Sequence, residues 1–380
     1  MSLLGVHLTM LIGPPLPLPP PAHPRLLDAL VSVEVTQSDS QSSGVQAVFR
    51  APRSIANVID LPVVADPMLR AGNRMIVMVT AGIVPQVLFD GIITLIEFKP
   101  GSGGDDATVA VTGLDLSVLM DRKEVNREFT AQPDNVAALT ILSAYAPYGV
   151  MPIVVPPKSL DAPVPTDRIP QQRGTDLSHL QEMAKRHAYV FFVEPGRVPG
   201  VNKGYWGPPP RLSIPQPALT VDMGSESNVK SIGFQHDEAA AARVEALVQD
   251  RKTNRSMPVR TFVSLRPPLA LYPGLSNPTL AGRKLNTPKG GQTQPQAQEQ
   301  AQADTEASMD VVKADGELDV ARYGGFLKAR ALVGLRGVGF RYDGLYYVSS
   351  VTSNIARHSF TQKFSLAREG TGSTVPVVRI

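Results

Sequence analysis

The chain has 380 residues, of which 43% are hydrophobic and 6% aromatic, so about two to four domains with buried cores are expected. The formal net charge is only +3 and the basic residues form no clusters, which argues against a dedicated nucleic-acid binder. The absence of cysteine excludes disulfides, cysteine nucleophiles and thiolate metal sites.

The N-terminal residues 1–24 end in a proline run, Gly13-Pro-Pro-Leu-Pro-Leu-Pro-Pro-Pro. The segment has neither the basic n-region nor the small-residue cleavage site of a signal peptide. No apolar run approaches the roughly 18 residues of a membrane span. Because polyproline II does not join a sheet ladder easily, we expect an extended arm. A proline-rich docking ligand is the alternative.

Alternating apolar residues predict a β-hairpin over Leu27–Ala51 and strands over Asn73–Thr80, Gln86–Phe98 and Ala107–Gly113. Asp90-Gly91 lies between apolar runs and favours a bulge or tight bend. Several strands at short spacing indicate an antiparallel barrel or sandwich over residues 25–130. For Asp115 we favour a turn or helix-capping role over chemistry, because no second acid or histidine lies nearby in sequence.

The middle of the chain predicts an α+β arrangement. A helix is expected over Asp134–Tyr148 with Asp134 as its cap, followed by a proline-rich stretch, Met151–Pro170. Within Gln171–Glu194, Thr175 is the expected N-cap of a helix that runs directly into an aromatic strand, Tyr189–Val193. Trp206 lies in a Pro/Gly loop, Arg197–Pro210, where plugging a core is favoured over binding a sugar or a partner.

The following region is mixed. Val229–Asp237 is expected as a strand, and alternation favours a second strand from Ala242, although helix propensity over Glu238–Asp250 points the other way. Arg266–Gly290 is rich in proline and expected to be irregular. The low-complexity segment Thr287–Ala307 predicts a mobile loop, with a partner-bound helix as the alternative. A further helix is expected somewhere in residues 308–320.

The C-terminal part predicts strands again. These are Gly325–Val333, Gly339–Tyr342, Tyr346–Val351 and Phe360–Ala367. Asp343-Gly344 between two aromatic runs predicts a tight hairpin turn.

Four stretches resemble segments of phage tail hub proteins, in the same order. They are Gln171–Glu194, Leu88-Phe-Asp-Gly-Ile-Ile-Thr94, Gly113-Leu-Asp-Leu-Ser117, and the pair Gly344–Ser353 with Phe360–Arg368. The first is similar to the "late control D" segment, which also occurs in the N-terminal half of the VgrG proteins of type VI secretion and in hubs of extracellular contractile injection systems. The resemblance covers residues 28–265 and 310–370. Ser353 stands where the family often has a histidine, so no role is carried over from it.

The resemblance implies a mainly β, α+β fold with two similar antiparallel β-barrels and an α+β insert, three chains forming a ring. The expected parts are an arm (1–24), a first barrel (25–130), the insert (131–230), a second barrel (231–265 and 310–370), an irregular insert (266–309) and a tail (371–380). The implied function is a structural hub of a phage tail baseplate or contractile injection system, a homotrimer that adapts a sixfold inner tube to a threefold spike.

The implied partners are the chain itself, a trimeric spike protein, a hexameric inner tube protein and baseplate proteins, with no nucleic acid and no membrane insertion. Because the chain stops at Ile380, soon after the last family strand, the spike is expected to be a separate protein. Assembly in the bacterial cytoplasm is expected.

The residues themselves predict no enzyme, no catalytic residue, no cofactor and no metal ligand. His179 and His187 are eight residues apart, which is not a metal-ligand spacing, and His236-Asp237-Glu238 is better explained as a solvated loop. The other histidines are His7, His23 and His358. Two alternatives remain: a baseplate-associated peptidoglycan hydrolase, and a carbohydrate-binding β-protein using Tyr205 and Trp206.

Overall fold

The structure is a computed structural model. It describes residues 2–3, 6–16, 18–51, 61–81, 84–101, 107–157, 169–249, 255–277, 279–286, 294–357 and 359–374. The largest element is a 13-stranded sheet that is curled around two hydrophobic cores. The predicted fold class, mainly antiparallel β with an α+β insert, is confirmed. Residues 250–254 and His358 lie outside the described residues.

Six strands of this sheet, β2 to β7, form one unit, hereafter the first unit. It is ordered β2-β5-β6-β7-β4-β3. A short helix, α1 (Pro24–Ala29), leads into β3. The strands are β2 (Val6–Gly13), β3 (Leu30–Ser38), β4 (Gly44–Arg50), β5 (Arg74–Ala81), β6 (Val84–Lys99) and β7 (Thr108–Asp115), and a two-residue strand, β1 (Ser2–Leu3), pairs with β2.

Six later strands form the second unit, ordered β13-β20-β21-β22-β19-β14. Taken in chain order within each unit, the strands occupy the same places: β2 corresponds to β13, β3 to β14, and so on to β7 and β22. One pairing differs, because β13 runs parallel to β20 whereas β2 is antiparallel to β5. The strands are β13 (Gln216–Thr220), β14 (Val229–His236), β19 (Val312–Asp319), β20 (Leu332–Arg336), β21 (Gly344–Ala356) and β22 (Ser359–Arg368).

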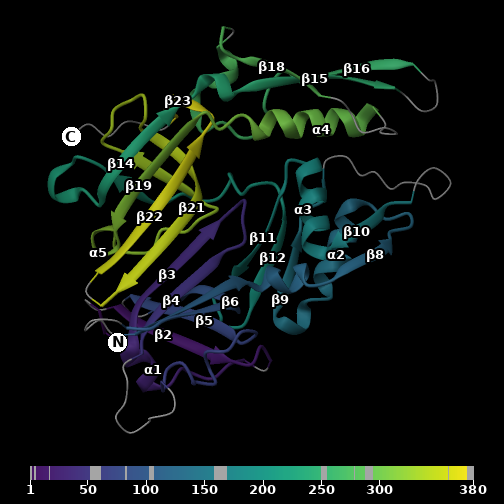
Figure 1. Ribbon diagram of the computed structural model, residues 1–380. Coiled ribbons are helices and arrows are strands. Elements are labelled where there is room, and N and C mark those ends of the chain that lie inside the picture. The colour runs from purple at the N-terminus through teal and green to yellow at the C-terminus, as the bar shows by residue number, and fades with distance from the viewer. Residues whose placement is uncertain are drawn as a thin grey trace.

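The two units share one sheet, because β3, an edge strand of the first unit, pairs with the C-terminal part of β21 of the second unit. Figure 1 shows β19, β22, β21 and β3 running side by side across the molecule. Alternating residues of these strands point inward, such as Val33 and Val35 of β3, and lie in the core of the first unit. Phe326 and Phe360 pack against both cores, with ring centroids 5.2 Å apart, so the two cores meet at this pair.

The α+β insert lies between the two units in sequence and has its own core around Trp206, Leu180 and Ile141. It runs from residue 116 to residue 215, which shifts both expected boundaries, because β8 already pairs with β10 and β13 belongs to the second unit. Its elements are η1 (Leu116–Asp121), β8 (Glu124–Glu128), α2 (Asp134–Ser143), η2 (Ala146–Tyr148), β9 (Val150–Val154), β10 (Gln171–Thr175), α3 (Asp176–Arg186), β11 (Val190–Pro195) and β12 (Asn202–Gly207).

Two predicted caps are confirmed and one is wrong. Thr175 accepts a hydrogen bond from the backbone N–H of Ser178 at the start of α3, and Asp115 accepts one from Ser117 at the start of η1. In α2 the N-cap is Pro133, so Asp134 is the first helical residue. Its carboxylate contacts Arg186 and His187 instead, which takes it away from the cap position.

In sequence, a small layer is inserted between β14 and β19 of the second unit. The corresponding strands of the first unit, β3 and β4, are joined by a tight turn only. The layer's three-stranded sheet, ordered β16-β15-β18, carries one helix, α4, at the top of Figure 1. The layer comprises η4 (Glu238–Ala240), β15 (Ala242–Gln249), β16 (Ser256–Arg260), β17 (Ala270–Pro273), η5 (Gly274–Ser276), β18 (Gly282–Asn286) and α4 (Gln294–Ala307). The strand predicted from Ala242 is confirmed as β15, but it lies outside the second unit.

The expected mobile Gln-rich loop is wrong for residues 294–307, which form α4. Ala297 and Ala301 are buried against Val244, Val248 and Val259, so the alanines of this polar-looking helix supply an apolar stripe. The amides also bind neighbouring backbone, since Gln298 and Gln302 donate to the carbonyls of Arg260 and Val263. The rest of the segment, residues 287–293, lies outside the described part of the chain.

Several other expectations need correction. Residues 6–13 are not a free arm, because β2 pairs with β5 along its whole length. Residues 312–319 form β19 rather than a helix, and 370–373 form β23 (Gly370–Ser373), which pairs with β17. Trp206 lies in a strand, β12, and not in a loop.

The predicted tight turn at Asp343-Gly344 is also wrong. Gly344 opens β21, and the chain reverses earlier, over residues 337–343, where Gly337 and Gly339 take positive φ angles of 94° and 91°. Asp343 closes this turn by accepting a hydrogen bond from the backbone N–H of Val338. Consequently Gly339–Tyr342 is not a strand, and the strand expected over Gly325–Val333 begins only at Leu332.

Candidate functional site

One face of the large sheet carries polar side chains that continue from the second unit into the first. A cross-strand row runs in register from Glu317 on β19 through Lys363 and Thr352 to Thr36 on β3. At the junction of the units, the hydroxyl oxygens of Thr36 and Thr352 lie 3.1 Å apart and are hydrogen bonded. The opposite face of the same strands faces the cores, so this polar face is the one available for contact with other molecules.

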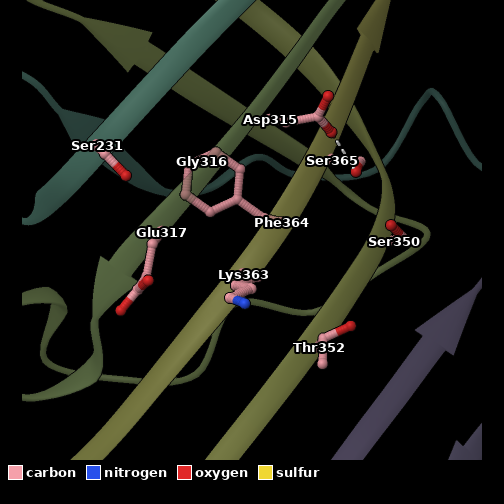
Figure 2. Close-up of a pocket in the computed structure, with 9 residues that line it drawn as sticks. All are labelled: Ser231, Asp315, Gly316, Glu317, Ser350, Thr352, Lys363, Phe364 and Ser365. Atoms are coloured by element: carbon pink, nitrogen blue, oxygen red, sulfur yellow. Dashed lines mark hydrogen bonds between the residues drawn. The ribbon is translucent and has the colours of Figure 1, made fainter.

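The polar face is hollowed over the second unit by a pocket of about 400 Å³. Figure 2 shows Asp315 and Glu317 on β19, Lys363 and Ser365 on β22, and Ser350 with Thr352 on β21 around it. The hydroxyl of Ser365 donates a hydrogen bond to the carboxylate of Asp315. Gly316 permits the close strand packing beneath, because a Cβ there would lie 2.6 Å from the ring of Phe364.

Several strand edges of the large sheet have no neighbour within the described part of the chain, among them that of β13, which pairs with β20 alone, and two further edges. One of these two belongs to β14, which pairs with β19 alone. The other belongs to the C-terminal part of β6, because β5 covers β6 only as far as Ile92 and β7 lies on the opposite side. Free strand edges expose unpaired N–H and C=O groups and are therefore surfaces for pairing with another chain.

A buried salt bridge fixes the insert to the first unit. Arg74 on β5 and Asp90 on β6 form a bidentate pair with N···O distances of 2.6 and 2.8 Å, and Asn202 of β12 donates to the same carboxylate. Asp90-Gly91, expected as a bulge or bend, thus lies inside a continuous β6. The Asp-Gly pair marks this position in the sequence. Its partners, Arg74 and Asn202, come from other strands and cannot be recognised from the local pattern.

A second buried arginine, Arg330, joins both units and the insert. Its guanidinium donates to the carbonyl of Ser38 and the hydroxyl of Ser43, lies 3.7 Å from Glu194, and sits 4.0 Å from the ring centroid of Phe192. Burial lowers the pKa of Arg330, against the opposing effect of Glu194. Asp115 stands next to this group; burial raises its pKa, while hydrogen bonds from Ser117 and Ser43 act in the opposite direction.

His187 connects the insert to α4. Its Nε2 lies 3.0 Å from Asp134 on α2 and its Nδ1 lies 3.0 Å from Glu299 on α4. Burial lowers the pKa of this imidazole, but the two carboxylates outweigh that effect and raise the pKa to about 9. His187 is therefore a charged link between two layers.

The other residues singled out from sequence do not converge on one site. His179 stacks on Phe129, and His236 lies next to Glu238 and Arg341 at the end of β14. Trp206 is fully buried and its Nε1 donates to the carbonyl of Leu180, which confirms the core role and leaves no ring face for a sugar. Within the described ranges, no three His, Asp or Glu side chains gather closely enough to hold a metal ion.

The helices that the structure describes are all too short or too polar to cross a bilayer. No protein-family model matches the sequence, and no curated protein matches it.

Comparison with solved structures is more informative. A tail protein from Neisseria meningitidis superposes with a TM-score of 0.66 at 13% identity, covering 96% of this chain and 97% of that one. The 43 kDa tail protein of prophage MuSo2 from Shewanella oneidensis gives 0.65 at 12% identity, with 96% and 98% coverage. An E. coli component of the type VI secretion system, described as similar to T4 bacteriophage tail proteins, gives 0.54 at 12% identity, with 91% and 77% coverage.

A VgrG complex from Francisella also matches, with a TM-score of 0.58 at 9% identity, covering all of this chain and 60% of that one. The chain therefore has the fold shared by phage tail proteins and VgrG-type proteins. This confirms the fold that the sequence resemblance implied.

Proposed function

We propose that this protein is the structural hub of a phage tail baseplate or contractile injection system. The observation that carries the proposal is the repeated strand order, because one chain contains two units of the same topology. Three such chains around a threefold axis present six alike units, which matches a sixfold tube on one side and a threefold spike on the other. The structural neighbours described above, which are tail and secretion proteins, support the same role.

The homotrimer buries the free edges of β14 and of the C-terminal part of β6, which accounts for their lack of neighbours within the described part of the chain. The proposed partners are a trimeric spike protein, a hexameric inner tube protein and baseplate proteins, and assembly takes place in the bacterial cytoplasm. Catalysis has no part in this proposal, and the burial of Trp206 removes the basis of the sugar-binding alternative.

Light scattering during size exclusion tests the oligomeric state. We expect a mass of three 40.7 kDa chains for the purified protein alone, and that mass plus the bound spike protein when the spike is added. A species that stays monomeric even with the spike present would contradict the proposal.

A further inference from the structure

The correspondence between the two units extends to individual residues. A register shift falls between Leu30 and Ser32 in the β3·β4 pair, and another between Val229 and Ser231 in β14·β19. Both β3 and β14 thus carry one extra residue at the same place, so each residue of β3 corresponds to a residue of β14. By this correspondence Thr36 matches Gln235.

The same holds for the two long strands, β6 and β21. Their pairing with β7 and β22 shifts around Thr94 and around Ser349. The hydroxyl of Thr94 donates to the carbonyl of Thr112 (3.3 Å), and that of Ser349 donates to the carbonyl of Ser365 (3.0 Å). These two bulges are equivalent, and the correspondence matches Glu97 of β6 with Thr352 of β21.

The correspondence defines two equivalent junctions between the units, and only one of them forms inside the chain. The edge of β3 pairs with the C-terminal part of β21 over seven residue pairs, from Ser38 with Ser350 to Ser32 with Ala356. The counterparts of these two edges are β14 and the C-terminal part of β6, and both lack a partner strand on that side within the described sheet.

Side-chain exposure follows the same division. At the internal junction, Val35 is 1% exposed and Ser353 is 4% exposed. Phe98, the counterpart of Ser353, is 42% exposed, and Phe234, the counterpart of Val35, is only partly buried. The free edges thus carry apolar side chains at positions that are covered where a neighbouring unit is present.

We propose that β14 of one copy of this chain pairs antiparallel with the C-terminal part of β6 of a second copy, in the register of the internal junction. Transferred residue by residue, that register places Gln235 opposite Glu97, Phe234 opposite Phe98, and Gly233 opposite Lys99. An amide then faces a carboxylate and two aromatic rings face each other, both favourable cross-strand pairs. The ladder ends near Pro100, which has no N–H to donate.

This junction rests on the proposed trimeric hub and specifies its contact. Three copies joined in this way alternate internal and intermolecular junctions around one ring and leave neither edge free. The polar face described above then continues from one copy to the next.

Cysteine cross-linking tests the register, because the natural chain has no cysteine. Facing residues of antiparallel strands lie within disulfide distance. In the double variant Glu97→Cys/Gln235→Cys we expect oxidation to convert most of the chain into covalent dimers and trimers on a non-reducing gel. Either single variant has no facing thiol and stays a monomer band.

Two further variants serve as matched controls. Thr36→Cys/Thr352→Cys places thiols at the corresponding internal positions, so it loses its free thiols on oxidation without forming oligomers. Leu95→Cys/Ser231→Cys uses the same two strands out of register and does not cross-link. Efficient cross-linking of this pair instead would overturn the proposed register.

Light scattering on the same samples separates the two proposals. A trimer that fails to cross-link through residues 97 and 235 overturns the β14–β6 junction and leaves the hub in place. A monomer that fails to cross-link overturns both.

Discussion

At the scale of single residues, sequence predicts local interactions well and distant ones poorly. The caps at Thr175 and Asp115 are confirmed because both partners lie within three residues. Asp90 was expected to bend the chain, whereas it binds Arg74 and Asn202, which are distant in sequence. Nothing in a local pattern identifies such partners, so the buried links between the units and the insert could not be predicted.

His187 provides a test at this scale. Its pKa is raised from an ordinary 6.5 to about 9 in the folded chain, so protonation favours the folded state. The stabilisation is fully present below about pH 6.5 and is lost as the pH rises through 9. A shift of this size corresponds to at most about 3 kcal/mol. Urea unfolding at pH 6.5 and 9.5 should show a decrease in the free energy of unfolding.

The control is His187→Gln, which keeps a polar side chain but does not titrate. Its free energy of unfolding should change less between the two pH values than that of the natural chain. Equal pH dependence in the two proteins would show that His187 is not the titrating link.

At the scale of elements, composition misled most clearly at α4. The segment has few large apolar residues, and low complexity favours disorder when a chain must fold alone. The small sheet β16-β15-β18 supplies the missing surface, because Val244, Val248 and Val259 receive the alanine stripe. The strand β15 was predicted correctly because its alternation had the period of a half-buried strand.

Ala301→Glu tests whether α4 docks through its alanines. A carboxylate buried without a partner costs on the order of 3 kcal/mol, which should detach the helix from β15 and β16. Hydrogen exchange should then accelerate in α4 and β15 while the large sheet keeps its protection. Ala307→Glu is the matched control, because Ala307 is the last helical residue and is exposed. Unchanged exchange in Ala301→Glu would contradict this packing.

At the scale of the whole molecule, the repeated topology is the feature that sequence indicated only through resemblance. Motifs near Asp90 and Gly344 suggested two similar barrels, but the shared strand order depends on pairing between strands far apart in the chain. The strand order therefore divides the chain differently from the expected boundaries where insertions occur. The layer carrying β15 and α4 enters the second unit where the first has a short turn, between β14 and β19.

The symmetry of the assembled particle tests the central claim most directly. Class averages of the purified protein, viewed along the particle axis in electron micrographs, should show six similar lobes around a central opening. Only alternate lobes should be identical, because each chain supplies one first unit and one second unit. A particle with twofold symmetry, or a ring of six chains, would contradict the account.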